Sequence, residues 1–174
     1  MKLDSQQITY LIDLPKKVVE GNTLLNQKSI LLKAPFQERY SLLSEENDDF
    51  LFLIELWQSG KNLLKVTFHF QEDSANYGLL RVDYGGRHRN PETINEYVPE
   101  AYLPYAGQWL QEPHIHATVP GYRPLAWAMP LADDSFAVKN IHSSLEISDA
   151  LSAFFSRINV QTQLLVTVQT DAFS

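Results

Sequence analysis

The chain contains no cysteine, which excludes disulfides and thiolate chemistry and is compatible with the cytoplasm. Basic residues are also scarce, because 14 lysines and arginines face 21 aspartates and glutamates, for a net charge of -7. Bulk charge therefore argues against nonspecific binding to nucleic acid, although it leaves room for a local basic patch. No stretch approaches the roughly 18 apolar residues that a membrane span needs, and no repeat or low-complexity tract is present. We expect a soluble, unprocessed cytoplasmic protein.

The length and composition predict a single domain. A chain of 174 residues with 44% hydrophobic content can bury one core but is too short for two comfortable domains. We therefore expect residues 1–174 to form one globular domain with an irregular aromatic loop at residues 91–112.

The local patterns predict an α+β fold with a central antiparallel sheet of about five strands. Asp4 or Ser5 can cap a helix that kinks at Pro15 and ends at Gly21. Its predicted apolar stripe consists of Ile8, Leu11, Ile12, Val18 and Val19. A second helix is expected near residues 145–157. The predicted strands cover residues 29–33, 36–43, 50–57, 64–71, 77–84, 113–118 and 163–169, and the strand at 50–57 is apolar on both faces, as in a sheet covered on both sides.

Two of these strands carry the most reactive side chains of the chain. In a strand, residues i and i+2 share a face, so Arg81 lies beside Asp83 and His114 beside His116. Short turns make neighbouring strands antiparallel, which adds the polar face of residues 64–71 to the same surface. We interpret His69 and His142 as isolated surface or satisfied core residues.

The segment between Pro91 and Pro113 differs from the rest of the chain, because it combines four aromatic residues with two prolines and a glycine. The aromatic residues are Tyr97, Tyr102, Tyr105 and Trp109. Long irregular connections are often functional, so these rings could form a lid that stacks on a ligand. We rank an apolar flap over the sheet ahead of a lid, since aromatic residues beside prolines bury readily without a ligand.

Several motifs carry a resemblance. They are Phe52 to Gly60, Lys65-x-Thr67, Leu80-Arg81-Val82-Asp83, His88-x-Asn90-Pro91, Pro113-His114-Ile115-His116, Tyr122, Trp127-Ala128 and Pro130-Leu131. In this order they resemble an uncharacterised family of small bacterial and phage-borne proteins that is classed only as a domain of unknown function. More distantly, the Arg-x-Asp strand and the late histidine pair resemble small toxins of toxin-antitoxin modules. Relative to the closer family, residues 117–124 lack an acidic residue and residues 93–112 resemble an insertion.

The histidine pair is suited to acid and base catalysis on a phosphodiester. Two imidazoles near neutral pH can serve as general base and general acid. Arg81 or Lys65 could stabilise the negative charge of a developing phosphorane, and Asp83 could hold an imidazole in the required tautomer. We therefore assign catalytic roles to His114, His116, Asp83 and Arg81, and substrate contacts to Lys65, His88, Tyr122 and Trp109.

Two alternatives remain open. His114 and His116 could bind a metal together with Asp83 or His88, but we rank this lower because Arg81 partly neutralises the carboxylate. We thus expect no metal and no cofactor. The second alternative is a non-catalytic protein-interaction module of a mobile element, in which the histidine cluster is structural. Our working hypothesis is a nuclease-like or toxin-like protein, with RNA or an antitoxin-like protein as partner and no association with a membrane.

Overall fold

The computed structural model describes residues 1–169 and contains two α-helices, two short 3-10 helices and twelve strands in that range. The helical elements are α1 (Ser5–Asp13), η1 (Glu100–Tyr105), η2 (Ser144–Glu146) and α2 (Ile147–Arg157). The strands are β1 (Lys17–Glu20), β2 (Thr23–Leu24), β3 (Gln27–Lys33), β4 (Gln37–Leu43), β5 (Phe52–Gln58), β6 (Val66–Glu72), β7 (Tyr77–Tyr84), β8 (His88–Arg89), β9 (Trp109–Leu110), β10 (His114–Ala117), β11 (Trp127–Pro130) and β12 (Gln163–Gln169). None of these helices is long and apolar enough to cross a membrane.

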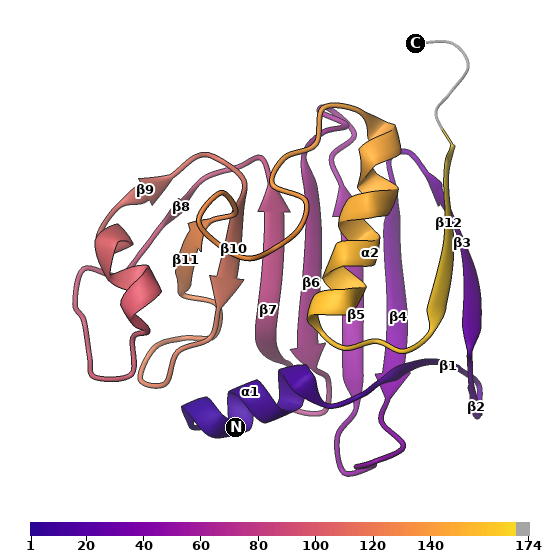
Figure 1. Ribbon diagram of the computed structural model, residues 1–174, viewed down its shortest axis with the longest axis horizontal. Helices are drawn as coiled ribbons and strands as arrows, with labels where there is room; N and C mark the ends of the chain where they lie inside the picture. Colours follow the sequence, from indigo (N-terminus) through magenta and orange to yellow (C-terminus); the bar gives the residue numbers. More distant parts are fainter. Residues whose placement is uncertain (170–174) are drawn as a thin grey trace.

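The architecture is α+β and is built on a large antiparallel sheet, as predicted (Figure 1). Its strand order is β11-β10-β7-β6-β5-β4-β1-β2, so the sheet has eight strands and not about five. Strands β3 and β12 form a separate parallel pair, and β8 pairs with β9. The strands at 77–84 and 163–169 have the predicted bounds.

The prediction of a long first helix is wrong beyond Asp13, where α1 ends. The helix begins as expected, because the Asp4 carboxylate accepts from the Gln7 amide at 2.8 Å in a capping box. It ends at Asp13 because the next residue, Leu14, precedes Pro15 and adopts an extended ψ of 126°. Residues predicted as the end of the helix form β1, where Val18 is buried in a strand paired with β4.

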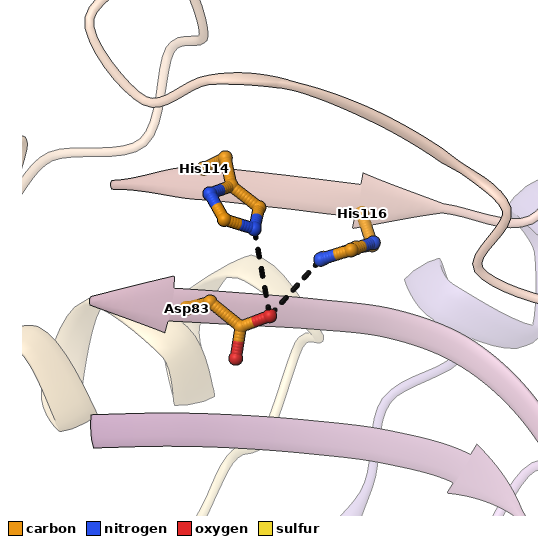
Figure 2. Close-up of side chains that lie close together, drawn as sticks. All are labelled: Asp83, His114 and His116. Atoms are coloured by element: carbon orange, nitrogen blue, oxygen red, sulfur yellow. Dashed lines mark hydrogen bonds and ion pairs between the residues drawn. The ribbon is translucent and has the colours of Figure 1, made fainter. Parts of the chain in front are cut away.

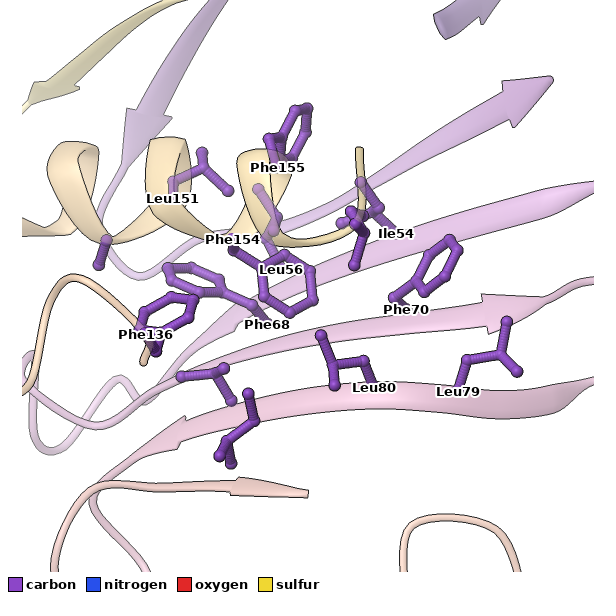
Figure 3. Packing of buried hydrophobic residues seen from close by; sticks show 14 of the residues in the cluster. Ile54, Leu56, Phe68, Phe70, Leu79, Leu80, Phe136, Leu151, Phe154 and Phe155 are labelled. Carbon is purple, nitrogen blue, oxygen red and sulfur yellow. The ribbon is translucent and has the colours of Figure 1, made fainter. Parts of the chain in front are cut away.

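The core lies between one face of the sheet and α2 (Figures 1 and 3). Alternation on the central strands directs every second side chain into it, and Val66, Phe68 and Phe70 are fully buried as expected. On α2, Leu151, Phe154 and Phe155 lie on one side of the helix and pack against the sheet, with the rings of Phe68 and Phe154 5.6 Å apart. The face toward α2 therefore supplies most of the hydrophobic stabilisation.

The opposite face of the central strands is open, which corrects the prediction for β5. We expected this strand to be covered on both sides, and Leu53 is indeed buried. Glu55, however, is half-buried, and Trp57 is 39% exposed. The open face of β5, β6 and β7 carries the polar side chains that the sequence placed together.

The segment at residues 91–112 is partly ordered into η1 and β9, and η1 lies against β11. Tyr102 is buried, whereas Tyr97 and Trp109 are about half exposed at 50% and 54%. The segment is therefore an apolar flap at the β11 edge of the sheet that leaves two aromatic rings on its surface.

Lys16 is buried in the core and connects the C-terminal ends of α1 and α2. Its Nζ donates hydrogen bonds to the carbonyl oxygens of Ile12 at 2.9 Å, Leu14 at 2.6 Å and Ile158 at 3.0 Å. These carbonyls end α1 and α2, where backbone acceptors have no partner within the helix. One ammonium group thus satisfies three acceptors from two helices that are far apart in the sequence.

Aromatic rings surround the remaining side of this ammonium group. Lys16 Nζ lies 5.0 Å from the ring centre of Phe52 and 5.1 Å from that of Phe70. Burial lowers the pKa of Lys16 to about 7, although the negative charge of Asp13 acts in the opposite direction. The carbonyls and the rings therefore contact an amino group whose charge is disfavoured by burial.

We predict that Lys16→Met lowers the free energy of unfolding by about 2 to 4 kcal/mol, because each buried carbonyl left without a donor costs about 1 to 3 kcal/mol. Lys17→Met is the matched control, since Lys17 only pairs with the exposed Glu45 and should change stability by less than about 0.5 kcal/mol. Urea denaturation of both variants measures the difference. Equal stability of the two variants would contradict the proposed role of Lys16.

Candidate functional site

The strand register places eight side chains in two rows on the open face of the sheet. The first row crosses β5, β6, β7 and β10 and consists of Trp57, Thr67, Asp83 and His114. The second row is displaced by two residues and consists of Glu55, His69, Arg81 and His116. Directly paired residues point to the same face, so three β-ladders bring the predicted catalytic residues together.

Asp83 is the centre of this arrangement (Figure 2). Its Oδ1 accepts from Thr67 Oγ1 at 2.6 Å and from Arg81 Nε at 3.1 Å. Its Oδ2 lies 2.9 Å from the same Nε, 3.0 Å from His116 Nε2 and 3.7 Å from His114 Nε2. The carboxylate therefore meets donors from three neighbouring strands although it is almost fully buried.

These partners keep Asp83 ionised. Burial on its own would raise the pKa of this carboxyl group. Hydrogen bonds from His116 and Thr67 and the positive charge of Arg81 outweigh burial and hold the pKa of Asp83 well below its usual range. The site thus has a fixed negative charge at its floor.

The two histidines of β10 differ in their hydrogen-bond partners. His114 Nδ1 lies 2.6 Å from the carbonyl oxygen of Glu112, which can only accept, so this nitrogen carries a proton. Burial lowers the pKa of His114, which favours its neutral state with a lone pair on Nε2. His116 meets an acceptor at each nitrogen, with Leu125 O 3.0 Å from Nδ1 and Asp83 Oδ2 3.0 Å from Nε2.

A third imidazole completes the cluster. The ring of His88 lies 4.5 Å from that of His116 and 6.1 Å from that of His114, between ring centres. Its Nε2 donates to the carbonyl oxygen of Ala126 at 2.9 Å. Burial and, secondarily, the positive charge of His116 lower the pKa of His88 to about 4, so this ring is neutral at pH 7.

The cluster lines a cleft with a volume of about 630 Å³. Besides the two rows, its wall contains Lys65, Gly85, Gly86, Arg87 and His88. Gly85 and Gly86 have φ values of 84° and 89°, which residues other than glycine rarely adopt, and they carry the chain around Lys65 at the end of β7.

The charge balance of the cleft favours anions. Glu55 pairs with Arg39, and Asp83 pairs with Arg81. Lys65 and Arg87 form no salt bridge within the described residues, so the wall carries cations without carboxylate partners in a chain whose net charge is -7. This is the local basic patch that the overall composition left open.

The structure brings together six of the eight residues that we assigned from the sequence. His114, His116, Asp83, Arg81, Lys65 and His88 all line the cleft. Trp109 lies outside the wall but contacts it, because the guanidinium carbon of Arg87 lies 5.0 Å from the centre of its ring. Tyr122 is elsewhere: its hydroxyl donates to Thr93 O at 2.6 Å and accepts from the Asn95 amide at 2.9 Å. It supports the flap and does not face the cleft.

Sequence reasoning missed several residues of the cleft, among them His69, Trp57 and Arg87. His69 is not isolated, because it lies in the second row and its Nε2 lies 3.0 Å from Gln71 Oε1. The alternation of β6 had already placed it on the polar face, so the signal was present but given too little weight. Trp57 and Arg87 had no local signal, since their positions in the cleft depend on the pairing of β5 with β6 and on the turn after β7.

The contacts of Asn90 give the His-x-Asn-Pro motif a structural role. The side chain of Asn90 accepts from the Ala128 amide at 2.7 Å and donates to the Ala128 carbonyl at 2.7 Å. It also donates to Tyr105 O at 3.1 Å. A single amide side chain therefore takes the place of a paired strand residue at the edge of β11 and ties the flap to the sheet.

The same cluster has the composition of a metal site. One ligand atom each from Asp83, His114 and His116 lies within 4.8 Å of the other two. Both histidines also donate Nδ1–H to a backbone carbonyl, which is the second-shell contact typical of metal-binding histidines. Against this, Asp83 already accepts from Thr67 and Arg81, so its oxygens offer few free lone pairs.

Comparisons with known proteins identify a family but no activity. No curated protein and no solved structure matches the chain. A model of a family of unknown function (DUF6978) matches residues 3–160, which include both rows of the cleft and all of α2. The chain belongs to this family of unknown function.

Proposed function

We propose that the protein cleaves a phosphodiester bond in RNA by histidine acid and base catalysis, without a metal. The observation that carries this proposal is the pair of histidines on one carboxylate: the neutral form of His114 has a lone pair on Nε2, which lies 3.7 Å from Asp83 Oδ2, and each ring nitrogen of His116 faces an acceptor. Enzymes place groups of opposite protonation side by side when one must accept and the other must donate a proton. The cations of the wall supply the affinity for a phosphate.

The proposed reaction uses only side chains of the cleft and the 2′-hydroxyl of the substrate. His114 Nε2 removes the proton of a ribose 2′-hydroxyl, and the resulting oxygen attacks the adjacent phosphorus. His116 gives a proton to the departing 5′-oxygen, which leaves a 2′,3′-cyclic phosphate and a free 5′-hydroxyl. Arg81 and Lys65 stabilise the added negative charge of the phosphorane. Asp83 acts as a positioning residue that orients His116 through the 3.0 Å contact between Asp83 Oδ2 and His116 Nε2.

This chemistry favours RNA over DNA as substrate. A hydroxyl beside the phosphate is an intramolecular nucleophile that needs only a general base, and only ribose offers one. A small ribonuclease of this kind would act as a toxin in its host cell, and an antitoxin-like protein that covers the cleft would be its natural partner. The bacterial or phage origin that the sequence resembles belongs to the same hypothesis.

A second candidate is a non-catalytic protein-interaction module of a mobile element. The observation that favours it is the flap, where Ile94, Tyr97, Leu103 and Trp109 are 39% to 54% exposed. In that case the histidine cluster only stabilises the join between β7 and β10. The open cleft over the histidines supports the first candidate, because a purely structural cluster has no need of one.

Histidine variants separate the two candidates. We expect His114→Ala and His116→Ala each to lower RNA cleavage, and growth inhibition on expression, by about 100-fold to 10,000-fold. Ile115→Ala removes the side chain between them from the core and should lower the free energy of unfolding by about 2 to 5 kcal/mol. Thermal melting and a cleavage assay with a fluorescent RNA measure both effects. Histidine variants that melt like Ile115→Ala, or a wild-type protein that binds a partner without cleaving RNA, would support the interaction module.

The pH dependence of cleavage tests the protonation of the base. Neutral His114 is the active form, and burial lowers its pKa, so activity should rise with pH through a midpoint below the usual value of about 6.5. His116, Asp83, Arg81 and His88 face this ring, so the midpoint belongs to the coupled cluster. The measurement is kcat/KM for an RNA dinucleotide from pH 4.5 to 8, with urea denaturation at each pH to exclude unfolding. A midpoint above 6.5 would contradict the assignment of His114 as base.

Metal analysis tests the metal-free part of the proposal. Protein purified without chelator should contain less than one equivalent of zinc, manganese or iron, because Arg81 and Thr67 occupy Asp83 and further cations line the cleft. Elemental analysis should give the same result for His114→Ala and His116→Ala. A stoichiometric ion that both variants lose would assign the cluster to metal-dependent hydrolysis.

A further inference from the structure

Two tryptophans flank the cleft, and each is paired with a cation. On one side, Lys65 Nζ lies 6.0 Å from the ring centre of Trp57. On the other, the guanidinium carbon of Arg87 lies 5.0 Å from the ring centre of Trp109. Of the three tryptophans in the chain, these two are 39% and 54% exposed, whereas Trp127 is fully buried. Exposed tryptophans are costly to leave in water, so two of them beside one polar cleft need an explanation.

The two pairs lie on opposite sides of the proposed scissile phosphate. Trp57 is in the first row, two strands from Asp83, which corresponds to about 10 Å at the usual strand spacing of roughly 4.8 Å. Trp109 is on β9, which pairs with β8 at the β10–β11 end of the sheet (Figure 1). His88 on β8 contacts the other two imidazoles, so the catalytic cluster lies between the tryptophans.

The chemistry of each pair matches a nucleotide. A nucleotide combines a flat aromatic base with a phosphate, and an indole ring beside a lysine or arginine offers a stacking surface and a positive charge at short range. Each indole ring stacks through its face and offers only one N–H donor at its edge, so stacking there would tolerate any sequence. A duplex, in contrast, keeps its bases stacked on each other and could not use either ring.

We propose that the cleft binds a single-stranded polynucleotide, with one base stacked on Trp57, another on Trp109, and the intervening phosphate on the histidine cluster. This inference rests on the proposed function for the position of the phosphate and extends it to the form of the substrate. Lys65 and Arg87 neutralise the phosphates next to the stacked bases. The site therefore spans more than one nucleotide and selects unpaired strands.

Binding of an uncleavable strand tests the inference separately from catalysis. The probe is a thymidine hexadeoxynucleotide, which lacks the 2′-hydroxyl that the proposed reaction needs. We expect it to quench the fluorescence of the exposed tryptophans, and we expect Trp57→Leu and Trp109→Leu each to weaken its binding by about 5-fold to 100-fold. Tyr97→Leu is the matched control, because Tyr97 is 50% exposed on the same flap but, unlike Trp109, does not stack with a cation of the cleft wall within the described residues. It should bind the probe like the wild type.

Competition experiments define the form of the ligand. A duplex of the same length, thymidine monophosphate and inorganic phosphate should each bind at least tenfold more weakly than the hexanucleotide. Equal affinity for phosphate and hexanucleotide, or tryptophan variants that bind like Tyr97→Leu, would overturn the inference. Binding of the hexanucleotide that depends on both tryptophans, together with no cleavage of RNA, would leave this inference intact and reject the proposed catalysis. Cleavage of RNA that is insensitive to both tryptophans would do the reverse.

Discussion

The buried carboxylate of Asp83 is the constraint on which the site depends. An ionised carboxylate away from water is strongly unfavourable unless donors surround it, and here the donors come from β6, β7 and β10. Each donor can reach Asp83 only in the observed register, since a slip of one residue would turn every side chain of a strand to the other face. The buried charge of Asp83 therefore requires this strand register, and the register in turn places the donors around the charge.

The same strands serve stability and chemistry on opposite faces. Toward α2 they present fully buried residues such as Phe68 and Val82, and toward the cleft they present Thr67 and Asp83 in the alternate positions. Because the two sets of side chains do not share a core, the polar face can carry charges that titrate without disrupting the packing opposite. Both histidines are held by β10 with Nδ1 on a backbone carbonyl and Nε2 directed toward Asp83 at the floor of the cleft (Figure 2).

The sequence predicted the centre of the site better than its edges. Alternation in residues 64–71 and the i, i+2 pairs at Arg81 and His114 depend only on local geometry, and so does the beginning of α1 at its capping box. The end of α1 was missed because β1 forms only by pairing with β4, and no local sequence pattern predicts that contact. Trp57 is likewise of a residue type that is usually buried. It is exposed because no further layer of the described residues covers that face of β5. Features fixed by long-range pairing were thus the ones that sequence reasoning could not supply.

Two buried charges in this fold are compensated in different ways, and the difference distinguishes structure from function. Lys16 is satisfied by backbone carbonyls and phenyl rings, which neither titrate nor face a cavity. Asp83 is satisfied by an arginine, a hydroxyl and a histidine that line an open cleft and can exchange their protons or partners with a ligand. Titratable groups gathered around a cleft are typical of functional sites, and the proposed function rests on this difference between Asp83 and Lys16.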